Sequence, residues 1–156
     1  MRKWLTISAI VLMLDQLTKY FVSRAFALYE SVEITPFFNL VLVHNRGAAF
    51  SFLSEAGGWQ RGFFIVLALG ASGWIVWLLR KHPQEKLFCI ALSLVLGGAL
   101  GNVIDRVLFG AVVDFLDFHA FGYHWPAFNV ADMGISCGAI LLIWDAMKGK
   151  TKPAAA

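Results

Sequence analysis

The chain has 156 residues, of which 59% are hydrophobic and 15% are charged, and its mean hydropathy is +0.69. This balance excludes an ordinary soluble domain and indicates an integral membrane protein. The pI is about 9.0, but no aromatic-basic RNA-binding motif is present, so anionic lipid headgroups explain the positive charge better than nucleic acid does.

One membrane-embedded domain, residues 1–156, is predicted because neither a Pro-rich linker nor a fixed-period repeat divides the chain. Within it we predict four transmembrane helices, each approaching the roughly 20 apolar residues that span hydrocarbon. Met1 to Leu14 resembles the start of a cleaved signal peptide, but the apolar stretch continues past Asp15 to Val22 without a clear Ala-x-Ala site. We therefore treat it as a retained first helix. The predicted helices are about 4–22, 62–79, 87–104 and 127–147, with outer segments 23–61 and 105–126.

The positive residues set the predicted orientation. They gather in both termini and in the short second connection, which places both termini on the cytoplasmic side. The outer segments contain the β-branched and aromatic runs Val32–Thr35, Phe37–Val43 and Gly110–Phe118, which predict a small extracytoplasmic β-sheet. The fold class is therefore an α-helical integral membrane protein with four helices and this sheet. The basic residues are Arg2, Lys3, Arg80, Lys81, Lys86, Lys148, Lys150 and Lys152.

Polar residues converge at one depth of the predicted bundle, given about 1.5 Å of rise per residue. Charged groups in a membrane are costly and usually functional. The alternative is hydrogen bonding between helices, with Asp15 paired to Lys19 four residues on and Asp105 paired to Arg106. Asp117 is expected at a solvated interface. The converging residues are Asp15, Lys19, Asn102, Asp105, Arg106, Asn129 and Asp132.

Asp114 and Asp132 flank the start of the last apolar segment. Two carboxylates brought together in a dry site cannot both ionise easily, so they can share one proton and act as an acid and base pair. Asn45 and Asn129 are suited to orient a carboxylate or substrate backbone, and Arg106 to bind lipid phosphate or a carbonyl. We predict an aspartyl peptidase.

Two other peptidase classes are less well supported. Gly134–Gly138 fits the Gly-x-Ser-x-Gly pattern of a serine nucleophile, but it lies within a predicted helix and the histidines fall in predicted loops, so helix packing explains it better. A metallopeptidase lacks His-Glu-x-x-His, and Asp117, His119 and His124 have no specific metal-ligand spacing. No metal or cofactor is expected. Cys89 and Cys137 are interpreted as apolar helix residues.

Five motifs in order resemble lipoprotein signal peptidase. The resemblance covers most of the chain, and it implies a bacterial inner-membrane enzyme that cleaves prolipoproteins just before the diacylglyceryl-modified Cys. It further implies that Asp114 and Asp132 are the catalytic dyad, supported by Asp15, Asn45, Asn102, Arg106 and Asn129. Family members generally have a small residue where this chain has Met133. The motifs are Asp15–Lys19, Asn45–Ser51, Gly101–Arg106, Val112–Phe115 and Phe128–Asp132.

The expected partners are diacylglyceryl-modified prolipoproteins and membrane lipids, with the enzyme a monomer. The outer loop Ser31–Leu53 is a candidate lid, with Gly47 and Gly57-Gly58 as flex points. A small proton-coupled transporter is the main alternative, but a transport path should continue to the inner face, where few polar residues lie. An assembly protein, the third class, would not need Asp114 or Asp132 to ionise.

Overall fold

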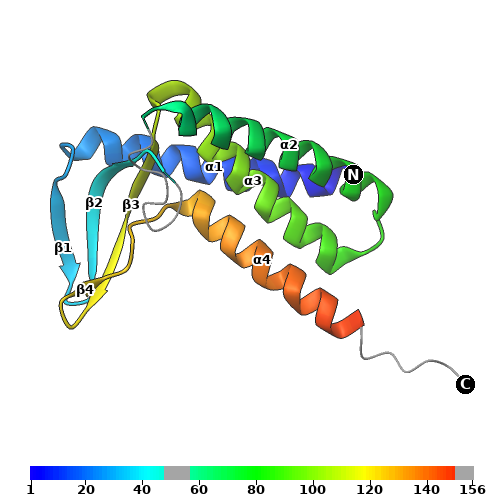
Figure 1. Cartoon of the computed structure of the whole chain (residues 1–156). Coiled ribbons are helices and arrows are strands. Elements are labelled where there is room, and N and C mark those ends of the chain that lie inside the picture. The colour runs from blue at the N-terminus through cyan, green and yellow to red at the C-terminus, as the bar shows by residue number, and fades with distance from the viewer. Residues whose placement is uncertain (48–56, 150–156) are drawn as a thin grey trace, which may run out of the picture.

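Four long helices and a small antiparallel sheet make up the computed structural model, which describes residues 1–47 and 57–149 (Figure 1). All four helices are long and apolar enough to cross a membrane. A helix satisfies its own backbone hydrogen bonds in lipid, which is why apolar segments of this length take this form. The helices are α1 (Arg2–Ala25), α2 (Trp59–Lys81), α3 (Lys86–Phe109) and α4 (Val130–Gly149).

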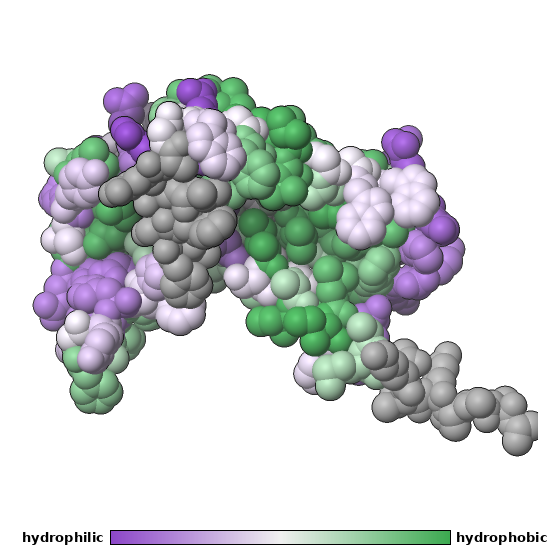
Figure 2. Space-filling model, viewed as in Figure 1, coloured by the Kyte–Doolittle hydropathy of each residue, from purple (hydrophilic) through white to green (hydrophobic). Residues whose placement is uncertain are grey.

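Helix α3 is the central helix of the bundle. In its most apolar stretch 56% of the residues are buried, against 17% in each of the other three helices. Small residues let the neighbours approach closely: a Cβ on Gly97 would meet the Ser8 carbonyl oxygen of α1, and one on Gly98 would meet the Ala131 carbonyl oxygen of α4. The outward faces of the helices are apolar, as the green surface in Figure 2 shows, and this suits contact with lipid.

The sheet lies at one end of the bundle, while the N-terminus, the α2–α3 connection and the end of α4 lie at the other (Figure 1). All its neighbouring strands run antiparallel, and the sheet follows chain order. The pairing of β2 with β3 places Asn45 opposite Val112 and Val43 opposite Asp114. The strands are β1 (Ser31–Thr35), β2 (Phe38–Asn45), β3 (Val112–Ala120) and β4 (Tyr123–His124).

The ends of the third and fourth helices differ from the sequence-based bounds. Helix α3 continues to Phe109, where Gly110 adopts φ +76° and caps it by donating to the Arg106 carbonyl oxygen, so Asp105 and Arg106 lie inside the helix. Helix α4 starts at Val130, because Phe128 is held in an extended bridge to Leu116.

The expectation that the histidines lie in loops is wrong for three of the four. His44 lies in β2, His119 in β3 and His124 in β4, because the outer segments form more regular sheet than their turn residues indicate. His82 follows the end of α2.

Candidate active site

Asp114 and Asp132 reach one cavity from different elements. Asp114 lies on β3 and Asp132 in the first turn of α4, and both line a cavity of about 1080 Å³ at the junction of helices and sheet. Asn45, Asn102 and Arg106 line it too. The structure therefore brings five of the sequence-predicted site residues together at one surface.

Asn129 links the two aspartates. Its side-chain Nδ2 donates to Asp114 Oδ1 at 2.6 Å, and its backbone N–H donates to Asp132 Oδ2 at 3.3 Å. Its Oδ1 in turn accepts the backbone N–H of Asp132 at 2.9 Å, an N-cap interaction that fixes the start of α4. Asn129 is fully buried, so it acts from behind the cavity and positions both carboxylates at once.

Two more asparagines supply the remaining hydrogen bonds. Asn45, at the end of β2, donates to Asp114 Oδ2 at 3.1 Å, and Asn102 of α3 donates to Asp132 Oδ1 at 2.8 Å. With the two bonds from Asn129, every oxygen of the two carboxyl groups accepts a hydrogen bond from protein. The carboxyl groups are thereby held in fixed orientations before any substrate binds.

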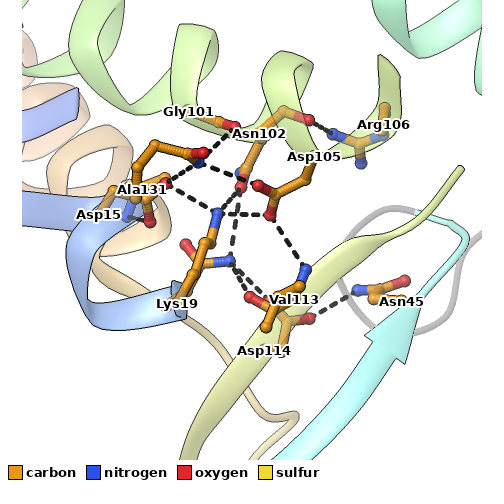
Figure 3. Close-up of polar contacts among 12 residues, drawn as sticks. Asp15, Lys19, Asn45, Gly101, Asn102, Asp105, Arg106, Val113, Asp114 and Ala131 are labelled. Atoms are coloured by element: carbon orange, nitrogen blue, oxygen red, sulfur yellow. Dashed lines mark hydrogen bonds and ion pairs between the residues drawn. The ribbon is translucent and has the colours of Figure 1, made fainter. Parts of the chain in front are cut away.

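A buried ionic network lies behind the aspartates (Figure 3). Lys19 of α1 is at its centre, with Nζ 2.8 Å from Asp15 Oδ2, 2.7 Å from Asp105 Oδ2 and 3.1 Å from Asn102 Oδ1. Asp15 also accepts the backbone N–H of Ala131 at 2.8 Å, next to Asp132. Asp15 is fully buried and outside the cavity lining, so it supports the site without facing substrate.

The alternative that Asp105 pairs with its neighbour Arg106 is wrong, because Asp105 pairs with Lys19 instead. Adjacent helix residues point in different directions, and Asp105 faces α1, where it contacts Lys19 and accepts from Gln16 Nε2 at 2.9 Å. Its Oδ2 also accepts the backbone N–H of Val113 at 3.0 Å, one residue before Asp114. The network therefore contacts the backbone beside both aspartates: Val113 on β3 and Ala131 on α4.

Arg106 is occupied by backbone carbonyls. Its guanidinium donates to the Gly47 carbonyl oxygen at 2.9 Å and to the Asn102 carbonyl oxygen at 3.3 Å, and it lies over the Phe64 ring at 5.0 Å. Of the two partners predicted for it, lipid phosphate and carbonyl, the structure contains the carbonyl contacts. Arg106 thus ties α3 to the end of β2, beside Asn45.

The electrostatics of this region favour a proton on Asp114. Burial and the charge of Asp132 raise the pKa of Asp114 from 3.8 to about 7, although the hydrogen bonds from Asn45 and Asn129 and the charge of Lys19 oppose the shift. Among the described residues, four buried or cavity-lining carboxyl groups, Asp15, Asp105, Asp114 and Asp132, outnumber the three nearby cations, Lys19, Arg106 and the cavity-lining Arg46. One shared proton lowers this excess of negative charge.

Asp117 was expected at a solvated interface, and the structure corrects this. Its side chain is buried on the sheet, where it accepts from Asn39 Nδ2 at 2.8 Å and pairs with His124 Nδ1 at 2.9 Å. The neighbouring strands β2 and β4 provide these partners. Asp117 is therefore part of the hairpin that connects Asp114 to Asp132, and it lies outside the cavity lining.

The structure describes the residues on which the serine and metal alternatives rest. The Gly134–Gly138 run is helical, and its two glycines pack closely: a Cβ on Gly134 would lie 3.0 Å from Val11 of α1, and one on Gly138 would meet the Ala91 carbonyl oxygen of α3. Over residues 1–47 and 57–149, no group of three or more His, Cys, Asp or Glu is arranged to hold a metal ion. Cys89 is buried, but Cys137 is exposed and lines the cavity, which its assignment to a packed helix did not anticipate.

Residues 7–148 match the family model described as signal peptidase (SPase) II. The chain belongs to the signal peptidase II family. It is 63% identical over 145 residues to the lipoprotein signal peptidase of Ralstonia nicotianae, covering 93% of this chain and 84% of that protein. It is 56% identical over 148 residues to that of a Janthinobacterium species, covering 95% of this chain and 90% of that protein. Family membership confirms the resemblance and places the chain among peptidases rather than transporters.

Solved structures support the same fold. One, described as a bacterial membrane enzyme, superposes with a TM-score of 0.88 at 35% identity and covers 100% of this chain and 95% of its own. A second with the same description has a TM-score of 0.81 at 35% identity, covering 99% of this chain and 96% of its own. The predicted fold of four membrane helices and a small sheet is confirmed.

Sequence reasoning missed three supporting residues. The sequence predicts Lys19 and Asp105 at the depth of the site without a role in it, and it predicts no role for Gln16. Lys19 and Asp105 carry charge within predicted helices, and that costly placement was the available signal. Gln16 gave no signal of its own, because its three acceptors are Asp15, Asp105 and the Gly101 carbonyl oxygen, two of which come from a distant helix.

Proposed function

We propose that this protein is an aspartyl endopeptidase that cleaves prolipoproteins just before their diacylglyceryl-modified cysteine. It acts as a monomer in the bacterial inner membrane, with both termini cytoplasmic and the sheet on the outer side. Asp114 and Asp132 are its catalytic residues. Asn45, Asn102, Asn129, Asp15 and Arg106 position them or the substrate.

The observation that carries this proposal is the pair of carboxyl groups on one cavity. Each oxygen of Asp114 and Asp132 accepts a hydrogen bond from protein, and the raised pKa of Asp114 favours a retained proton near neutral pH. Two carboxyl groups that share one proton provide a base and an acid side by side. Peptide hydrolysis needs both.

The reaction follows from these two roles. The ionised carboxylate removes a proton from water, and the resulting hydroxide adds to the scissile carbonyl carbon. The protonated carboxyl group donates a hydrogen bond to the carbonyl oxygen as negative charge develops there. When the C–N bond breaks, a carboxyl group returns a proton to the leaving amine of the modified cysteine. The pair titrates as a unit, so these roles belong to the dyad rather than to one named residue.

The cavity suits a substrate that arrives within the bilayer. It is lined by the polar groups named above and by apolar side chains of α3 and α4, including Phe109 and Ile135. A signal peptide spans the membrane as an apolar helix, and its modified cysteine lies at the outer surface. This arrangement lets the helix and the lipid approach from the membrane while the peptide bond reaches the aspartates.

Only part of the outer loop that we propose as a lid lies within the described residues. Residues 48–53 of the predicted Ser31–Leu53 lid, and 48–51 of the motif that begins at Asn45, lie outside the described residues. Gly57 and Gly58 adopt φ values of +75° and +102°, which glycine tolerates at no steric cost.

The proposed substrate is tested with purified enzyme in liposomes and two forms of one prolipoprotein, with and without the diacylglyceryl group. We expect release of the signal peptide from the modified form and, at matched concentration, at least about a tenfold lower rate from the unmodified form, since lipid contacts contribute binding energy. Mass spectrometry of the products identifies the cleaved bond. Cleavage at any other bond, or equal rates for both forms, would contradict the proposed substrate.

A further inference from the structure

Helix α4 presents two different faces at its outer end. Ala131, Gly134 and Gly138 follow a spacing of three and four residues, and they pack closely against α1 and α3. Asp132, Met133, Ser136 and Cys137 lie on the other side and line the catalytic cavity. The close packing of the first face fixes the rotation of α4, so the second face is held toward the cavity.

Met133 directly follows Asp132 in the chain, and both residues lie on this cavity-lining face. Its backbone N–H donates to the Asn129 carbonyl oxygen at 3.1 Å, in the same turn that positions Asp132. Met133 is 47% exposed and lines the cavity together with Asp132. A long, flexible thioether in this place occupies space that a bound substrate also needs.

The direction of α4 indicates which part of the substrate lies there. From Asp132 the helix runs away from the sheet and toward the end of the bundle that holds the N-terminus (Figure 1). A signal peptide that enters from the same side runs alongside α4, with its modified cysteine at the level of the dyad. The substrate residue just before that cysteine then lies one step deeper, at the level of Met133.

We propose that Met133 determines the size of the substrate residue that directly precedes the modified cysteine. This inference rests on the proposed function and adds a specificity residue to it. Met133 leaves room for a small side chain at that substrate position and excludes a large one by contact with its thioether. A residue smaller than methionine opens this space, and a larger one narrows it.

The test uses modified precursors that carry Ala, Val or Leu directly before the cysteine and are otherwise identical. We expect Met133→Ala to raise the ratio of kcat/KM for the Leu precursor to that for the Ala precursor by about tenfold or more, the usual effect of one or two methylene groups in a pocket. Met133→Phe should lower the ratio of the Val precursor to the Ala precursor. Met147→Ala is the matched control, because Met147 is exposed on the same helix but lies outside the cavity lining.

An unchanged Leu-to-Ala ratio in Met133→Ala, or an equal rise in Met147→Ala, would overturn the role of Met133. The Ala precursor separates the two claims. If the wild-type enzyme does not cleave the Ala precursor, the proposed function itself fails. If wild type and Met133→Ala both cleave it and have equal Leu-to-Ala ratios of kcat/KM, only the specificity role is refuted.

Discussion

At the scale of single residues, two opposing effects act on Asp114. Burial and the charge of Asp132 favour its protonated form, while the hydrogen bonds from Asn45 and Asn129 favour its ionised form. For Asp114 burial is the largest of these effects, so its pKa rises to about 7. The balance leaves the pair able to hold or release a proton near neutral pH, as general acid and base catalysis requires.

The raised pKa of Asp114 predicts how stability depends on pH. The folded state binds this proton more tightly than the unfolded chain does, so the free energy of unfolding should fall as pH rises from about 4 to about 7 and level off above. The contribution is at most about 4 kcal/mol, from roughly 1.4 kcal/mol per pKa unit. Thermal unfolding in detergent at pH 5 and pH 8 measures it. Asp114→Asn should show a smaller difference between the two pH values; a difference as large as that of wild type would contradict the assignment.

Replacing Arg106 by lysine tests whether activity requires a planar guanidinium at this position. Lysine keeps the charge but cannot span the Gly47 and Asn102 carbonyl oxygens at once, so Arg106→Lys should lower kcat/KM by about tenfold. Arg61→Lys is the control, since Arg61 makes an exposed bond to the Val107 carbonyl oxygen. Initial rates at subsaturating substrate compare the two. Equal rates for Arg106→Lys and wild type would remove Arg106 from the site.

The residues that can be predicted from sequence are those whose type and place are themselves unusual. Asp114 and Asp132 stand out as carboxyl groups beside apolar segments, and the structure places both on one cavity. The partners of Asp105 and Asp117 could not be predicted, because Lys19 and His124 reach them through tertiary packing and strand pairing. Local spacing pointed instead to Arg106 for the first and to solvent for the second.

At the scale of elements, the contact between α3 and α4 decides the geometry of the site. Asn102 of α3 reaches Asp132 of α4 only because Gly98 and Ala131 let the two helices approach closely. The helices themselves were predictable from hydropathy. Their close approach at Gly98 could not be predicted, since glycine is frequent in membrane helices for several reasons.

Gly98→Ala should separate these helices. The new Cβ would meet the Ala131 carbonyl oxygen, which is backbone and cannot move aside without shifting α4. We expect a loss of about 2 kcal/mol in stability, typical of overpacking, and a lower kcat. Gly73→Ala is the matched control, because nothing lies within 4 Å of its Cβ position on α2. Thermal unfolding and cleavage rates check both variants, and equal behaviour of the two would argue against this contact as the determinant.

The β3–β4 hairpin is the second element that links the aspartates. It carries the chain from Asp114 to Asp132, and Asp117 holds it through Asn39 and His124. Asp117 is therefore unsuitable as a neutral control for the dyad. Glu33 on β1 is a better control position, because it is exposed and lies outside the cavity lining.

At the scale of the whole molecule, the protein combines an apolar bundle with a polar site at one end. Hydrophilic residues gather at the sheet and at the opposite end of the helices, and the surface between them is largely hydrophobic (Figure 2). The distribution of Lys and Arg supports a cytoplasmic location for the end opposite the sheet. With this orientation the cavity lies near the outer surface of the membrane, where the modified cysteine of a prolipoprotein resides.

The aspartyl mechanism is tested most directly by single-turnover cleavage of a diacylglyceryl-modified prolipoprotein by Asp114→Asn and Asp132→Asn in liposomes. Asparagine preserves shape but can neither accept the proton of water nor return one to the leaving amine. Each variant should therefore lose about 10²–10⁴-fold in rate while still folding and inserting, and Glu33→Gln should match wild type. Cleavage by either aspartate variant at a rate close to that of wild type would contradict the account.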